Sequence, residues 1–156
     1  NAKLSEMTID NKGFKILRKF KTEIVVQHET PLYKLDRFIE GIRTILQKHP
    51  YTKNSSIDVF LTNISTKGIQ ISIGYTYKIY NQKEEFTYRE FILKQILQLA
   101  EIIKVKLVND HSEVINSINH ATDTSDDLDN QLNKYFTNLD AQLKSNLIKF
   151  SANVKE

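Results

Sequence analysis

The chain of 156 residues contains no cysteine and no tryptophan, and it has only two prolines and four glycines. Without cysteine it can form neither a disulfide framework nor a thiolate metal site. Four glycines could hardly supply a glycine-rich phosphate-binding loop. No run of about eighteen apolar residues is present, so no segment is expected to span a bilayer, and no signal peptide is visible.

The patterns of common active sites are also missing. No Gly-x-Ser-x-Gly elbow is present, and the pair Glu84-Glu85 is interpreted as a helix start rather than as an acid/base pair. The histidines show no metal-ligand spacing such as His-Glu-x-x-His; they are His28, His49, His111 and His120. We therefore expect no enzyme, no catalytic or metal site and no cofactor.

Charge is distributed unevenly along the chain, whose net charge is +3. Residues 1–110 contain 18 basic and 12 acidic residues, whereas residues 111–156 contain 4 basic and 7 acidic residues. The length predicts one ordinary domain with an appendage. Because the first residue is Asn1 and not methionine, we expect a fragment of a longer protein.

The clearest single element is an amphipathic helix predicted from Thr30 to His49. Thr30 could cap its start, Pro31 suits the first helical position, and His49-Pro50 is a natural end. Gly41 is unusual inside a helix, where it costs roughly 1 kcal/mol relative to alanine. It is interpreted as a point of close approach, either to a neighbouring element or to another subunit. The apolar stripe is formed by Leu35, Phe38, Ile39, Ile42, Ile45 and Leu46.

Alternating patterns predict strands at residues 14–27, 57–62 and 69–78, the last two joined by a turn at 63–68. A second helix is predicted at residues 84–104 and a short fourth strand at 105–108. The resulting order, β-α-β-β-α-β, indicates an α+β fold of the ferredoxin-like, split βαβ type, with both helices on one face of the sheet. The predicted division is a linker at 1–13, an α/β domain at 14–110 and an acidic helical tail at 111–156.

Apolar residues of the tail recur with an eleven-residue period. Thr124-Ser125-Asp126-Asp127 is a strong helix start. The helix could fold back onto its own domain or serve as an oligomerisation helix, and the pattern favours neither. The stripe consists of Leu128, Leu132, Phe136, Leu139, Leu143, Leu147, Phe150 and Val154.

Basic residues are concentrated in the first strand, at Lys15, Arg18, Lys19 and Lys21. This run is either a solvated strand face or an electrostatic patch, and the former is the more common case. RNA-binding sheets of the same topology stack bases on exposed aromatic residues. Here Tyr75 and Tyr77 continue the apolar face of their strand, so they are predicted to lie in the core, and no nucleic-acid partner is expected.

Several short phrases of the sequence carry a family resemblance. They are Asn1-Ala2-Lys3-Leu4, Asp10-Asn11-x-Gly13, Arg18-Lys19-Phe20-Lys21-Thr22, His28-Glu29-Thr30-Pro31, Phe38-Ile39-Glu40-Gly41-Ile42-Arg43 and His49-Pro50. Together they resemble the cytoplasmic carboxy-terminal region of small-conductance mechanosensitive channels, over about residues 1–108, and the first phrase looks like the end of the family's middle β-domain. Asn109-Asp110-His111 departs from the family, which continues into a strand of a small barrel; the tail helix could replace that barrel.

This resemblance implies a vestibule domain below the pore of a membrane-tension-gated channel in the cell membrane, on its cytoplasmic side. Such channels are typically heptamers, so the implied partner is the same chain, and the membrane is reached only through a part absent from this sequence. The implied roles are assembly and the filtering of ions and solutes. The alternative is a free-standing ferredoxin-like module that binds a partner, RNA or a ligand and carries a helical oligomerisation tail.

Overall fold

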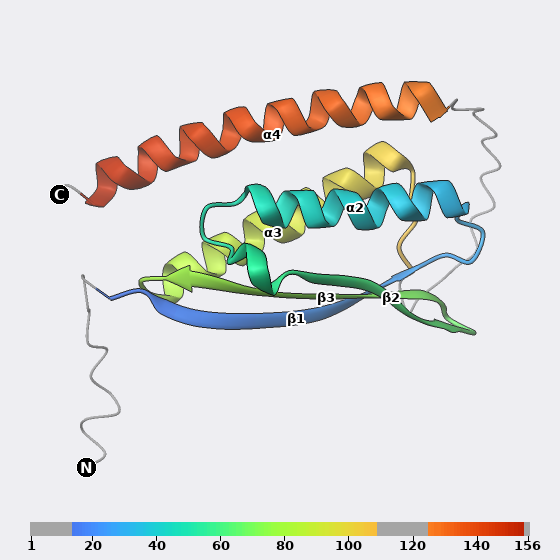
Figure 1. Ribbon diagram of the computed structural model, residues 1–156, viewed down its shortest axis with the longest axis horizontal. Coiled ribbons are helices and arrows are strands. Elements are labelled where there is room, and N and C mark those ends of the chain that lie inside the picture. The colour runs from blue at the N-terminus through green and yellow to red at the C-terminus, as the bar shows by residue number, and fades with distance from the viewer. Residues whose placement is uncertain (1–13, 109–124, 155–156) are drawn as a thin grey trace, which may run out of the picture.

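The computed structural model describes residues 14–108 and 125–154, with the side chains of the last helix described up to Asn146. Three layers are stacked (Figure 1): an antiparallel sheet, two helices that cover one of its faces, and a third helix over those two. The fold is therefore α+β. The elements are β1 (Ile16–Val26), α2 (Leu32–Lys48), η1 (Asn54–Ser56), β2 (Asp58–Ser65), β3 (Gly68–Ile79), α3 (Gln82–Ile103) and α4 (Ser125–Val154).

The sheet has the order β1-β3-β2, with β3 in the centre. Phe20 pairs with Tyr75 and Ile24 with Ile71, and directly opposed residues point to the same face of a sheet. The apolar side of each strand therefore faces α2 and α3, as the alternation predicts. The predicted core positions of the β3 tyrosines are confirmed, since both are almost fully buried.

The β2–β3 hairpin is tighter than predicted. Asn63, Ile64 and Ser65 belong to β2 and pair with Gln70, Ile69 and Gly68, so the predicted turn at residues 63–68 is wrong for most of its length. Gly68 has φ +151°, and a Cβ there would collide with the carbonyl oxygen of Val26. The turn depends on glycine for both reasons.

Helix α2 ends at Lys48 with His49 as its C-cap, close to the predicted end, but it starts differently. Pro31 occupies the N-cap position, and no side chain caps the helix there. The hydroxyl of Thr30 instead donates to the carbonyl oxygen of Gln27 at 2.7 Å. The prediction of a Thr30 cap is therefore wrong, because this hydroxyl closes the turn before the helix.

Two local hydrogen bonds cap the start of helix α3, and the sequence interpretation missed them. The Asn81 side chain accepts from the Glu84 amide at 2.9 Å, and the Glu84 carboxylate accepts from the Tyr80 amide at 2.8 Å. At the other end Lys104 adopts the left-handed conformation, with φ 61°. The chain then turns back toward β1.

The predicted fourth strand at residues 105–108 does not form as a strand. Leu107 makes a single antiparallel bridge to Val26. Two backbone hydrogen bonds flank that bridge, from Gln27 N to Lys106 O at 3.0 Å and from Val108 N to Val25 O at 2.8 Å. The ladder covers only the end of β1, so most of that edge lacks a neighbouring strand within the described residues.

Candidate functional site

The tail helix α4 lies over α2 and α3 of its own chain (Figure 1). Of the two predicted arrangements, the structure therefore has the one in which the tail folds back onto its own domain. The interior stripe of α4 differs from the predicted one at one position, because Tyr135 is buried whereas Phe136 is only half-buried. The Tyr135 hydroxyl donates to Gln95 Oε1 on α3 at 2.7 Å, and burial raises the pKa of this tyrosine. The buried stripe is Leu128, Leu132, Tyr135, Leu139 and Leu143.

Two ion pairs hold α4 alongside α2. Arg37 Nε lies 2.7 Å from Asp129 Oδ1, and Lys48 Nζ lies 2.8 Å from Asp140 Oδ1. The hydrogen bond from Arg37 lowers the pKa of the Asp129 carboxyl, and the same bond raises the pKa of Arg37. Because both acids lie 92 residues after their partners, the two helices run in the same direction.

The end of the predicted stripe lies beyond the described side chains. Helix α4 continues to Val154, but nothing is described of the side chains of Leu147, Phe150 and Val154. An oligomerisation role for these three residues stays a prediction. The predicted cap Thr124 and the predicted linker at residues 1–13 also lie outside the described residues.

Gly41 lies where α2 and α3 approach each other. A Cβ at this position would lie 2.5 Å from Cδ2 of Leu99 on α3, and Leu99 is fully buried. The close approach that Gly41 permits is therefore one between two helices of the same chain. A subunit contact at Gly41 stays a prediction.

The predicted basic run does not form one surface. Lys19 and Lys21 pair with Thr76 and Gly74 on the face of the sheet opposite the helices, whereas Arg18 pairs with Tyr77 on the covered face. The ammonium group of Lys15 lies 5.4 Å from the centre of the Tyr80 ring.

The open face also receives a lysine that sequence reasoning missed. Lys78 of β3 lies on the same face as Lys19 and Lys21, because it pairs with Leu17. The alternation of β3 places Lys78 on the polar face of its strand, but only the strand register shows that this face is shared with Lys19 and Lys21 of β1. Along this face β3 presents Gln70, Ser72, Gly74, Thr76 and Lys78, which offer no aromatic platform for nucleic-acid bases.

An aromatic cluster fills the end of the core below the C-terminus of α2. The His49 ring packs edge-on against Tyr88 at a centroid distance of 4.4 Å, and its Nδ1 accepts from the Tyr51 amide at 3.1 Å. Burial lowers the pKa of His49 to about 4. The Tyr88 hydroxyl shares a hydrogen bond with the Thr52 hydroxyl, whereas the buried Tyr75 hydroxyl has no partner among the described residues.

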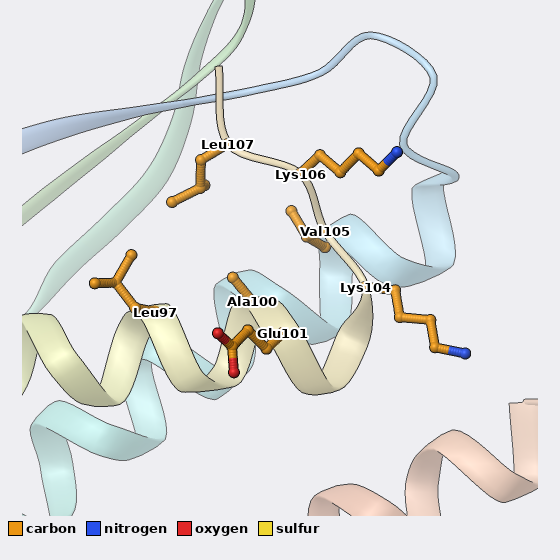
Figure 2. A pocket seen from close by; sticks show the side chains of 7 residues that line it. All are labelled: Leu97, Ala100, Glu101, Lys104, Val105, Lys106 and Leu107. Atoms are coloured by element: carbon orange, nitrogen blue, oxygen red, sulfur yellow. The ribbon is translucent and has the colours of Figure 1, made fainter. Parts of the chain in front are cut away.

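A shallow apolar groove of about 390 Å³ lies between the end of α3 and the segment that follows it. Figure 2 shows Leu97, Ala100, Val105 and Leu107 around this groove, with the ammonium groups of Lys104 and Lys106 pointing away from it. Glu101 completes the lining. The lining is therefore mostly apolar, and its charged groups lie at the rim.

Two classes of site are not found in the described part of the chain. No three of its His, Asp and Glu side chains are grouped so that they could hold a metal ion. Among the helices of residues 14–108 and 125–154, none combines the length and the apolar character that crossing a bilayer requires.

Comparison with known proteins gives a family. The model of the family "Mechanosensitive ion channel MscS, C-terminal" matches residues 20–107, which is more than half of the chain. The chain therefore belongs to this family of ion-channel domains, which is not a family of enzymes, and the resemblance stated from its sequence is confirmed. A search of curated proteins gives no match.

Solved structures show the same fold. The cryo-EM structure of Arabidopsis thaliana MSL1 A320V aligns with 64% of this chain and 37% of its own, at 13% identity and a TM-score of 0.55. The cryo-EM structure of Arabidopsis thaliana MSL1 aligns with 64% of this chain and 36% of its own, at 13% identity and a TM-score of 0.54. The chain thus spans little more than a third of the length of these proteins.

Proposed function

We propose that this chain is the cytoplasmic vestibule domain of a membrane-tension-gated ion channel, on the cytoplasmic side of the cell membrane. The observation that carries the proposal is the match of the channel-family model to residues 20–107, the part of the chain that builds the sheet, α2 and α3. The domain would contribute to assembly and to the filtering of ions and solutes below the pore. It would act as a homo-oligomer, a heptamer in the intact channel.

We also propose that the fold is of the ferredoxin-like, split βαβ type. The bridge between Leu107 and Val26 stands next to β1, where the fourth strand of that arrangement would lie. We regard residues 14–110 as the α/β domain of the vestibule and residues 111–156 as its helical tail. The tail would take the place of the family's small barrel.

Filtering would act through the electrostatic potential of the open sheet face, the face opposite α2 and α3. Lys19, Lys21 and Lys78 share that face, and a concentration of one charge sign raises the local concentration of the opposite ion. The acidic residues Glu23 and Asp58 lie on the same face, opposite Ser72 and Gly74. The basic excess is therefore largest toward the start of β1, where a vestibule would favour anions.

The function is tested by recording currents from membrane patches that contain the parent protein. Suction should open a conductance, and its absence would contradict the proposal. Charge reversal at Lys19→Glu and Lys21→Glu should then shift the reversal potential in a salt gradient toward cation preference. Lys67→Glu is the matched control, because Lys67 lies in the β2–β3 turn and should leave the potential unchanged. An unchanged potential in the double variant would disprove the filtering role.

A further inference from the structure

The two lateral edges of the domain differ in a way that suits contact between copies. One apolar row runs across the sheet on its helix-covered face. It follows from three pairings, namely Leu107 with Val26, Val26 with Ile69, and Ile69 with Ile64. The interior of this row is buried, but Ile64 at one end is 65% exposed. Leu107 at the other end lines the apolar groove.

A second apolar row runs beside the first on the same face of the sheet, at the next pairs of residues along the strands. It joins Ile24 to Ile71 and Ile71 to Leu61. Leu61 is 41% exposed, on the same edge as Ile64, and Leu97 in the groove is 53% exposed at the opposite edge. One edge thus carries protruding apolar side chains, and the other carries an apolar hollow at the same height along the sheet.

The β2 edge has the usual protection of an exposed strand only at its start, where Asp58 is charged and Arg43 of α2 donates to the carbonyl oxygen of Val59. Natural edge strands carry lysine, other charged residues or proline, which discourage contact with another chain. Residues 59–66, Val-Phe-Leu-Thr-Asn-Ile-Ser-Thr, contain neither a charge nor a proline. The outer strand β1, in contrast, carries Arg18, Lys19, Lys21 and Glu23. Covering the β2 edge would therefore remove apolar side chains from water and desolvate no charged group of that segment.

We propose that the Ile64 edge of one copy docks into the Leu97–Leu107 groove of the next copy. This inference rests on the proposed function, in which copies of the chain assemble, and it names the surfaces through which they meet. The two surfaces lie on opposite edges of one domain, so the contact is heterologous. Repetition of a heterologous contact gives a ring where the rotation closes. The apolar rows of neighbouring domains would continue from one copy into the next.

The absence of cysteine allows a direct test by disulfide trapping in the full chain. One sample carries Ile64→Cys and the other carries Leu97→Cys, both at exposed positions where substitution disturbs no buried packing. The samples are mixed, oxidised mildly and separated without reductant. The docked contact predicts that the mixed disulfide dimer is the main product, and each variant alone should give little dimer.

Matched controls separate this contact from chance collision. Asn138→Cys, on the exposed side of α4, replaces Leu97→Cys in a second mixture, which should lose the mixed dimer. Equal yields in the two mixtures would overturn the proposal. A dimer of Ile64→Cys with itself as the main product would also overturn it, because that result indicates β2 packing on β2 about a two-fold axis.

A chain with both substitutions adds an independent readout. Head-to-tail contact predicts a ladder of oligomers or a closed ring from the chain that carries Ile64→Cys and Leu97→Cys, whereas two-fold contact stops at a dimer. Trapping requires no current and no membrane. Its failure therefore concerns these two surfaces alone, and the failure of suction to open a conductance concerns the channel function.

Discussion

The body of the domain and its tail helix are held in different ways. In the body, residues from three strands and two helices share one core, in which Phe38, Ile42, Ile73 and Leu99 are fully buried. Helix α4 contributes a single stripe to that core. It is further held by two surface ion pairs, by a hydrogen bond from Arg37 to Ser125 and by one from Tyr135 to Gln95. The body is thus enclosed on several sides, whereas α4 is attached on one.

The family match follows the same division. It ends at residue 107, before α4 begins at Ser125. We infer that the body can fold around its own core and that α4 covers the exposed side of α2 and α3. Elements with few buried contacts open locally at a lower free energy than the whole domain. The stability of α4 should therefore be separable from that of the body.

Phe38→Ala should cause the largest effect. It removes a fully buried ring of α2 and should lower the free energy of unfolding by about 3–5 kcal/mol. Leu139→Ala removes a buried side chain of α4 and should cost about 2–5 kcal/mol, but mainly for the docking of that helix. Urea unfolding measures the loss of stability in each variant, and hydrogen exchange then shows whether protection is lost in the body or only in α4. Equal loss of protection in β3 for both variants would contradict the division.

Acidification should destabilise the body through His49. Its folded pKa of about 4 lies below the unfolded value, so the unfolded chain binds more protons as the pH falls. The stability that depends on the neutral ring is complete above about pH 6.5, and about 3 kcal/mol of it should be lost as the pH falls to about 4. Urea unfolding at several pH values measures this loss. His49→Gln should flatten the dependence, whereas His28→Gln should preserve it.

Gly41→Ala should destabilise the contact between α2 and α3 by about 1–3 kcal/mol, because the new methyl group meets Leu99. The better helix propensity of alanine offsets part of that cost. In the background of Leu99→Ala the same substitution should be neutral or stabilising. Additive effects in this double-mutant cycle would show that Leu99 is not the group that Gly41 accommodates.

The smallest effect is expected from the ion pair between Lys48 and Asp140. Both side chains are partly exposed, so Lys48→Met should lower the free energy of unfolding by less than about 1 kcal/mol. High salt should reduce the difference further. A loss as large as that of Leu139→Ala would mean that charges, and not the apolar stripe, hold α4 in place.

The local elements of the fold were accessible from the sequence because their periodic patterns are strong. The apolar stripe of α2 and the apolar faces of β1 and β3 lie close to their predicted places. The C-caps of α2 and α3, His49 and Lys104, stand at the predicted helix ends. The start of α2 was not accessible, since a threonine before a proline can cap a helix or close a turn. The choice depends on the position of the Gln27 carbonyl.

Features that depend on distant partners could not be predicted. The predicted fourth strand is reduced to one bridge between Leu107 and Val26, with a backbone hydrogen bond on either side of it, and this pairing joins residues far apart in the chain. Tyr135 replaces Phe136 in the buried stripe of α4 because Gln95, 40 residues earlier, offers its hydroxyl an acceptor. Alternation gives the face of each lysine within its own strand, but the grouping of Lys19, Lys21 and Lys78 follows from strand register and the groove follows from helix placement.

We propose that the body of this domain belongs to a tension-gated channel and that α4 covers it. Suction-evoked currents of the parent protein in membrane patches test this proposal when Phe38→Asp is compared with Leu139→Asp. Phe38→Asp should abolish the current by unfolding the body, whereas Leu139→Asp should release α4 and leave a suction-evoked current. A parent protein without such a current, or a current that persists with Phe38→Asp, would contradict it.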